Sequence, residues 1–225
     1  MPRIARIVGV DLPHHITQRG NYRQDVFLDD GDRKRYLSWI QEYSQKFGLS
    51  IWVYCLMRNH VHFIVTPHKE EALAKTFHTA HMRYSQYLNK KLKTTGHLWQ
   101  GRFYSCILDE SHFLAAAKYI ERNPVRAKIV KQAWDWKWSS ALTHINQSLN
   151  SPLKLANLFQ ITEMSNKSWK DCLNSQDDEK ILHQIRRHTL TGRPLGTVSF
   201  VEKLKEKFGQ RVSALPRGRP KKKLK

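Results

Sequence analysis

Two apolar runs meet at a short polar connection in Tyr54-Cys55-Leu56-Met57-Arg58-Asn59-His60-Val61-His62-Phe63-Ile64-Val65. We predict one strand over 50–57 and a second over 60–66, joined by a tight turn at Arg58-Asn59. Alternate side chains of a strand point to the same face, so His60 and His62 are neighbours on one face. Neutral imidazoles are common metal ligands, which makes this pair a candidate metal site. Two partly buried, hydrogen-bonded histidines are the alternative interpretation.

The segments on both sides of this hairpin complete a β-α-β-β-α-β order. A strand is predicted over 14–19, a helix over 30–47, a second helix over 71–92 and a fourth strand over 103–108. Gly48 supplies a stop for the first helix. This order is typical of a ferredoxin-like α+β sandwich with an antiparallel sheet.

The character of the chain changes in its last third. We predict three parts in chain order: a main domain over 1–145, a small helical appendage over 150–210 and a basic tail over 211–225. The appendage rests on three helical patterns, over 152–159, 178–190 and 199–208. Residues 191–196 are similar to the turn of a helix-turn-helix, so the appendage is a candidate DNA-binding region.

The charge of the chain is far from balanced. Its 39 Lys and Arg against 19 Asp and Glu give a formal net charge of +20. Such an excess indicates a polyanionic partner, and nucleic acid is the commonest one. We expect no membrane partner, because the sequence has no apolar run of about 18 residues and no apolar core of a secretion signal. The three cysteines are far apart and predict neither a zinc site nor a disulfide framework, so we expect a cytoplasmic protein.

The basic tail contains Arg217-Gly218-Arg219-Pro220, which resembles an AT-hook. Narrow minor grooves concentrate negative potential and attract arginine, so Arg217 and Arg219 are candidate contacts to AT-rich duplex. The segment has too few apolar residues to fold alone, and we expect it to be disordered. A nonspecific basic tail is the alternative.

A further helix is predicted over 111–122, ending before Pro124, and it carries a tyrosine away from its apolar stripe. Tyr119 lies on the same side as two alanines, which leave space above the helix. Asn123 follows four residues later and projects on the same face. This is the arrangement of a tyrosine beside a polar ligand. A boundary aromatic with its hydroxyl in water is the alternative, and Tyr87 is a weaker candidate nucleophile.

Four sequence blocks together resemble the REP-associated tyrosine transposases, a branch of the HUH single-strand endonucleases. The blocks are His14-His15-Ile16-Thr17-Gln18-Arg19-Gly20-Asn21, Leu56-Met57-Arg58-Asn59-His60-Val61-His62, Gly96-His97-Leu98-Trp99-Gln100-Gly101-Arg102-Phe103 and Tyr119-Ile120-Glu121-Arg122-Asn123-Pro124-Val125-Arg126. The resemblance covers roughly residues 10–145 and implies that the main domain is catalytic. The family often has proline where Arg58 stands, a departure in the turn that leaves the candidate ligands in place.

The resemblance implies a metal-dependent cut in single-stranded DNA. His60, His62 and Asn123 would hold Mg²⁺ or Mn²⁺, with water and phosphate oxygens completing the shell. Tyr119 would attack phosphorus, giving a 5′-phosphotyrosine link and a free 3′-hydroxyl that is able to reverse the reaction. Imidazoles alone favour Zn, Ni or Mn over Mg, so the choice of Mg²⁺ or Mn²⁺ follows the family.

The resemblance also implies DNA hairpins with flanking single-stranded bases as substrate. Basic and aromatic residues interleave between Lys90 and Tyr104, which suits backbone attraction and base stacking. The candidate DNA contacts are Arg19, Asn21, Arg23, His97, Trp99, Arg102, Arg122 and Arg126, besides Arg217 and Arg219 in the tail. Packing of Trp99 under a solvated basic loop is the alternative for that residue. A nucleoid-associated enzyme is thus expected. The rival functions are an inactive DNA-binding regulator and an RNA-binding protein.

Overall fold

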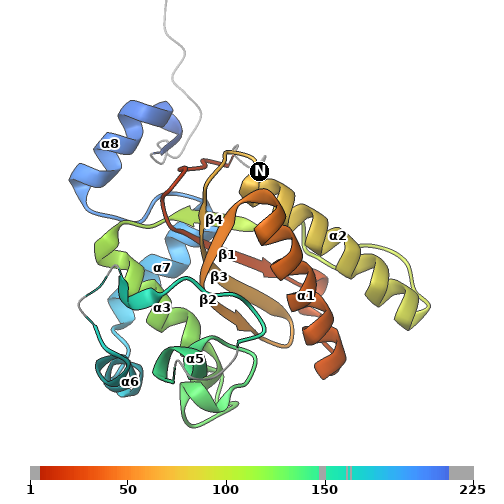
Figure 1. The fold of residues 1–225 in the computed structure, drawn as a ribbon. Coiled ribbons are helices and arrows are strands. Elements are labelled where there is room, and N and C mark those ends of the chain that lie inside the picture. The colour runs from red at the N-terminus through yellow and green to blue at the C-terminus, as the bar shows by residue number, and fades with distance from the viewer. Residues whose placement is uncertain (1–5, 147–150, 161, 163, 213–225) are drawn as a thin grey trace, which may run out of the picture.

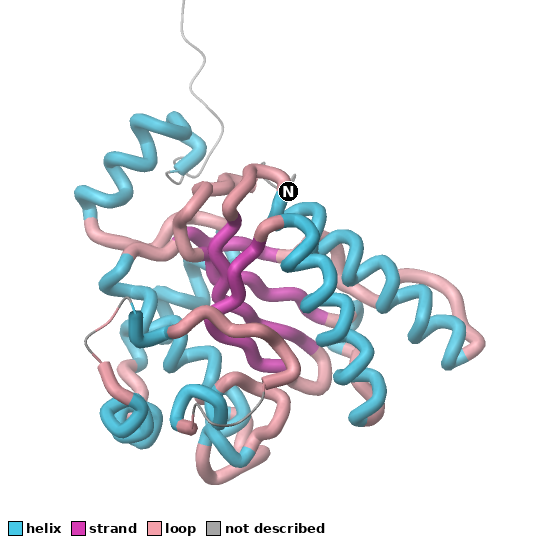
Figure 2. The backbone as a smooth tube through the Cα atoms, in the orientation of Figure 1, coloured by secondary structure: helices cyan, strands magenta, loops and turns pink. Residues whose placement is uncertain are grey.

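The structure, a computed structural model, describes residues 6–146, 151–160, 162 and 164–212. Its centre is one four-stranded antiparallel sheet in the order β2-β3-β1-β4, with helices on both faces (Figures 1 and 2). The strands are β1 His14–Arg19, β2 Leu49–Leu56, β3 His60–Pro67 and β4 Tyr104–Ile107. The helices are α1 Asp30–Phe47, α2 Ala72–Leu92, α3 Glu110–Glu121, α4 Asn123–Arg126, α5 Ala141–Ile145, α6 Asn166–Asn174, α7 Glu179–Thr191 and α8 Val198–Phe208. The predicted α+β fold and its β-α-β-β-α-β order are confirmed.

Local sequence signals place the ends of the helices. Asp29 accepts from the backbone N–H of Asp32 while the Asp32 carboxylate accepts from the backbone N–H of Asp29, so α1 begins with a reciprocal cap. It ends at Gly48, whose φ of 74° lies in the left-handed region that glycine adopts without steric cost. At the start of α3, Asp109 accepts from the backbone N–H of His112.

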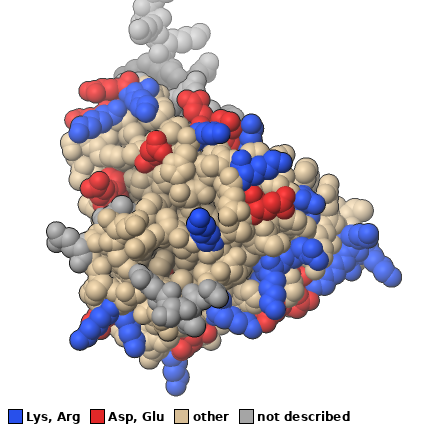
Figure 3. All heavy atoms as spheres, viewed as in Figure 1, with Lys and Arg blue, Asp and Glu red and all other residues tan. Residues whose placement is uncertain are grey.

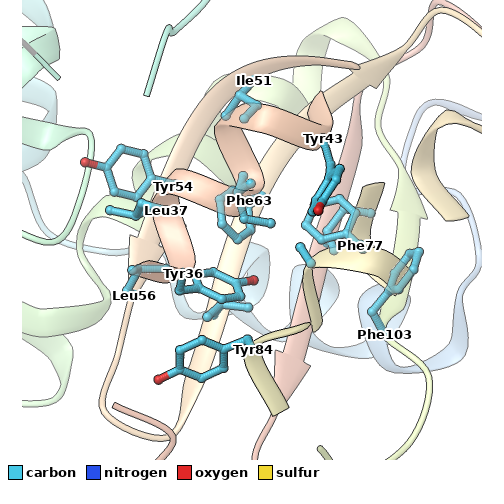
Figure 4. Packing of buried hydrophobic residues seen from close by; sticks show 14 of the residues in the cluster. Tyr36, Leu37, Tyr43, Ile51, Tyr54, Leu56, Phe63, Phe77, Tyr84 and Phe103 are labelled. Atoms are coloured by element: carbon cyan, nitrogen blue, oxygen red, sulfur yellow. The ribbon is translucent and has the colours of Figure 1, made fainter. Parts of the chain in front are cut away.

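The first face of the sheet is covered by α1 and α2. Figure 4 shows Tyr36 of α1 with Phe77 and Tyr84 of α2 around Phe63 of β3. Ring centroids of Phe63 and Phe77 are 5.5 Å apart, and those of Tyr36 and Tyr84 are 5.3 Å apart. Burying four such rings is a large share of the apolar driving force for this layer, because each removes about 150–250 Å² from water.

The second face is covered by α3, α6 and α7. Val53 and Ile64 of the sheet share one buried cluster with Phe113 of α3, Trp169 of α6 and Ile185 of α7. The helices expected as a small appendage therefore bury their apolar faces in the same core as the sheet. The Trp169 indole also donates to the buried Glu121 carboxylate at 2.9 Å, which ties α6 to the end of α3.

The prediction of a helix over 152–159 is wrong. Leu153 and Leu158 are buried, but the chain between them runs beside β2, where the backbone N–H of Ala156 donates to the Ile51 carbonyl at 2.7 Å. The apolar residues that produced a helical pattern instead cover the edge strand β2. Backbone groups that would form hydrogen bonds within a helix form them with this exposed edge.

The connection between α7 and α8 lies along the other edge of the sheet. The backbone N–H of Leu195 donates to the Ile107 carbonyl, and that of Asp109 donates to the Leu195 carbonyl. Residues 191–196, the candidate helix-turn-helix turn, thus cover β4 and contribute the buried Leu195. Beyond this connection, α8 packs through Leu204 against Ile7 and Ile107. No helix in the described residues has the length and apolar character of a membrane span.

Candidate active site

A pocket of about 390 Å³ opens where the second face of the sheet meets the C-terminal ends of α3 and α7. Its floor comes from strands β1 and β3, which are paired so that Thr17 lies opposite His62 and Arg19 opposite His60. Directly paired residues of neighbouring strands point to the same face. His15, Thr17 and Arg19 therefore line the pocket together with both histidines of the predicted pair.

His60 and His62 meet at a ring-centroid distance of 5.0 Å. The His60 Nδ1 lies 2.6 Å from the Asn59 Oδ1. The same carboxamide donates from its Nδ2 to the Arg23 carbonyl at 3.0 Å, which fixes its oxygen toward the imidazole. An oxygen there only accepts, so the His60 proton is on Nδ1 and Nε2 carries the lone pair. Burial lowers the pKa of His60 to about 4, with a smaller contribution from the charge of Arg19, and keeps the ring neutral.

His62 is buried beside a third histidine that sequence reasoning did not select. The His62 Nδ1 lies 2.9 Å from the His15 Nε2, and the two rings are within 17° of parallel. Burial holds the pKa of His62 well below its usual value, with the charges of neighbouring residues adding to the effect, and burial alone lowers that of His15 to about 3. The alternation His15-Ile16-Thr17-Gln18-Arg19 was the available signal for His15, since it puts that ring on the face of Thr17 and Arg19.

Tyr119 projects from α3 against both buried histidines. Its ring centroid lies 5.8 Å from that of His62 and 5.9 Å from that of His15, in edge-on contact. The Arg126 guanidinium carbon lies 4.4 Å from the same centroid and that of Arg186 lies 6.0 Å away. The tyrosine is only 8% exposed, so its ring is held by packing while its edge lines the pocket.

Asn123 lines the same pocket one turn after Tyr119. Its Oδ1 accepts from the Arg126 Nη2 at 2.9 Å, whereas its buried Nδ2 has no hydrogen-bond partner in the described part of the chain. Within residues 6–146, 151–160, 162 and 164–212, no three His, Cys, Asp or Glu side chains cluster as metal ligands do. The donors present are two imidazoles and one carboxamide. Two imidazoles suit Mn²⁺ better than Mg²⁺, and the Asn123 Oδ1 would share its lone pairs between the cation and Arg126, with water and phosphate oxygens as the remaining ligands.

Several predicted contacts are occupied within the protein. Arg122 donates through Nε to Asp177 at 3.0 Å, and Arg126 reaches the same carboxylate at 3.4 Å. Arg126 also donates to the Tyr119 carbonyl, so these two guanidinium groups anchor the segment before α7 onto α3 and α4. Trp99 is 8% exposed and donates to the His81 carbonyl at 3.2 Å, which agrees with the packing alternative.

Other predicted residues lie at the surface or away from the pocket. Asn21 and Arg23 belong to the loop after β1, and neither lines the pocket. His97 and Arg102 are exposed on the rim of a second hollow of about 580 Å³ beside α2. Tyr87 donates its hydroxyl to Asp32 at 3.0 Å and does not line the His60 pocket. The candidate tail contacts, residues 217 and 219, lie outside the described residues.

The side chains that α7 adds to the pocket were not predicted. Arg186, Thr189 and Leu190 all line it, although they are about 70 positions from Tyr119 in sequence. Their spacing of three and four residues marks one face of a helix. Nothing local in the sequence indicates that this face meets the histidines.

Comparison with known proteins agrees with this architecture. Residues 10–123 match the family model described as "Transposase IS200 like". A solved structure of a REP-associated tyrosine transposase bound to a REP hairpin aligns with a TM-score of 0.57 and 17% identity, covering 74% of this chain and 96% of that one. A putative transposase from Deinococcus radiodurans aligns with 20% identity and a TM-score of 0.34, covering 54% of this chain and 97% of that one. No curated protein matches the chain.

Proposed function

Because the chain belongs to the IS200-like transposase family, we propose that it cuts and rejoins single-stranded DNA beside hairpins through a covalent link to Tyr119. The observation that carries this proposal is the contact of the Tyr119 ring with His62, in a pocket that also contains His60 and Asn123. All four side chains belong to one chain, so a single molecule supplies the full set.

Each residue has a defined part in the proposed reaction. The Tyr119 oxygen attacks the phosphorus and its proton passes to water; the bond from phosphorus to the 3′-oxygen breaks, and that oxygen takes a proton from water to leave as the 3′-hydroxyl. Arg186, exposed at the pocket rim, attracts the DNA phosphate, while Arg126 holds the tyrosine ring in position. His60, His62 and Asn123 are the proposed ligands of Mg²⁺ or Mn²⁺, which when bound polarises and orients the phosphate as a Lewis acid.

The charge of the surface supports a DNA substrate. On the face in Figure 3, Lys and Arg side chains gather around the ends of α1 and α2. If six to ten phosphates are contacted, affinity falls by about 10³–10⁵ between about 50 and 200 mM salt. Binding comparisons therefore need one fixed salt concentration.

The test is a denaturing gel with labelled repeat hairpins and Mn²⁺ or Mg²⁺. The substrates are single-stranded hairpins with flanking bases, taken from repeats that neighbour the coding sequence. We expect a labelled protein band that disappears with EDTA, because the covalent link survives denaturation and its formation needs the cation.

Two other outcomes contradict the proposal. Tight hairpin binding without any adduct on these repeats points to the DNA-binding regulator. Preference for an RNA hairpin of matched sequence, measured by competition, points to an RNA-directed protein. The four pocket residues argue against a pure binder, because binding alone requires no such combination.

The loop after β1 presents an aromatic ring that sequence reasoning missed. Tyr22 is 94% exposed, and both Tyr22 and Arg23 have left-handed backbone, with φ of 50° and 60°. Hydrogen bonds on both sides hold this strained conformation: Asn59 donates to the Arg23 carbonyl at 3.0 Å, and the backbone N–H of Arg23 donates to the Gly20 carbonyl at 3.1 Å. We propose that Tyr22 stacks on a base of the flanking single strand.

Replacing Tyr22 tests this contact. Stacking on one base is worth about 1–3 kcal/mol, so Tyr22→Ala is expected to weaken binding of a hairpin with a single-stranded flank by about 5- to 150-fold. Tyr22→Phe keeps the ring and is expected to bind like the wild type. Fluorescence anisotropy at fixed salt measures both. Equal weakening by the two substitutions would contradict stacking.

A further inference from the structure

Helix α7 lies outside the family-matched segment, yet one of its side chains reaches the histidine cluster. The Thr189 hydroxyl is 2.8 Å from the His15 Nδ1, across 174 positions of sequence. Thr189 and His15 are both buried. This contact and the hydrogen bond between His15 and His62 form one continuous chain from α7 to a proposed metal ligand.

The Ile185 carbonyl determines which group donates in each of these hydrogen bonds. The Thr189 Oγ1 also lies 2.7 Å from the Ile185 carbonyl one turn earlier. A carbonyl oxygen only accepts, so the single hydroxyl proton is directed to Ile185. The Thr189 oxygen is then an acceptor, and the proton between it and His15 belongs to the His15 Nδ1.

The same logic passes through the imidazole to His62. A neutral imidazole has one N–H, so His15 with its proton on Nδ1 offers a lone pair on Nε2. That lone pair faces the His62 Nδ1 at 2.9 Å, and it places the His62 proton on Nδ1. The His62 Nε2 keeps its lone pair and takes part in no hydrogen bond with another described residue.

We propose that His15 and Thr189 are positioning residues that hold His62 in the tautomer whose Nε2 is available to the cation. This proposal rests on the proposed function, because it concerns residues that hydrogen-bond to the proposed metal ligands or to their partners. Asn59 performs the same task for His60 from the adjacent position. Outer partners of ligating histidines fix the tautomer and the ring orientation, and their removal typically costs 10–100-fold in metal affinity.

The test compares Thr189→Val with Thr189→Ser in the full-length protein. Valine keeps the shape of the buried side chain but removes the acceptor, whereas serine keeps the hydroxyl. Nitrogen-15 NMR of the metal-free protein reports the tautomer of His62. We expect an Nδ1–H tautomer in the wild type and in Thr189→Ser, and a mixture in Thr189→Val. Mn²⁺ titration is expected to give about tenfold weaker binding for Thr189→Val alone.

A second variant and a folding control keep the outcomes separable. His15→Phe keeps a ring but removes both hydrogen bonds, and is expected to weaken Mn²⁺ binding in the same way. Hairpin affinity without metal should be unchanged in all variants if the fold is intact. An unchanged His62 tautomer in both Thr189→Val and His15→Phe would overturn the inference. The wild type could also bind no Mn²⁺ while Thr189→Val still shifts the His62 tautomer. That result would overturn the proposed function but support the hydrogen bonds from Thr189 through His15 to His62.

Discussion

Tyr119→Phe is expected to abolish the covalent protein–DNA adduct while leaving hairpin affinity within about twofold of the wild type. The change removes one oxygen, the proposed nucleophile. The phenylalanine ring keeps the edge-on contacts with His15 and His62 and the packing under Arg126. Adduct formation on a denaturing gel and hairpin binding by anisotropy measure the two effects separately.

Tyr87→Phe is the matched control. Its hydroxyl donates to Asp32 on the α1 and α2 side of the sheet and does not line the pocket, so its adduct should equal that of the wild type. An adduct that persists in Tyr119→Phe and disappears in Tyr87→Phe would transfer the nucleophile to Tyr87. Loss of hairpin binding in Tyr119→Phe would show instead that the hydroxyl serves DNA recognition.

His60→Ala is expected to slow adduct formation by at least about 100-fold and to weaken Mn²⁺ binding. The cation is worth several kcal/mol to the transition state, and each 1.36 kcal/mol corresponds to about a tenfold change in rate. His60 is the better of the two histidines to replace, because it is only partly buried whereas His62 is bonded to His15 in the core. Single-turnover rates at saturating hairpin, with a Mn²⁺ titration, measure the effect.

His183→Ala provides the comparison for His60→Ala. His183 is an exposed histidine of α7 that does not line the pocket. Both the cutting rate and Mn²⁺ binding should be unchanged by that substitution. If His60→Ala cuts at the wild-type rate with undiminished Mn²⁺ affinity, the His60 and His62 pair is not the metal site.

The parts of the site with local signals were predictable from the sequence. The spacing of His60 and His62 depends only on strand alternation, and the relation of Tyr119 to Asn123 depends only on the helical repeat. The structure brings these four residues into one pocket. Helix α1 begins at a reciprocal aspartate cap and ends at a left-handed glycine, so its predicted bounds agree with Asp30–Phe47.

The rest depended on tertiary packing that short sequence patterns do not encode. The His15 and Thr189 contact joins residues 174 positions apart, and no spacing rule reaches that far. Trp99 lies in a basic stretch typical of a surface on which bases stack. Its ring instead packs in the core, with its centroid 4.7 Å from that of the His81 ring. The 152–159 pattern predicted a helix because apolar spacing does not distinguish a helix face from an extended segment against an edge strand.

The shared core of α7 and the sheet has a consequence for how the protein is made. During synthesis, Tyr119 leaves the ribosome 70 residues before Thr189, which is roughly 4–14 s at about 5–20 residues per second. Throughout that interval Val53 and Ile64 lack the cover of Ile185. His62 likewise lacks the hydrogen bonds from Thr189 through His15 that orient it. We therefore expect the nascent chain to bind Mn²⁺ about tenfold more weakly until α7 docks. A product truncated before α7 would lack Ile185 in the cluster around Val53 and Ile64, and we expect it to be more open to proteolysis.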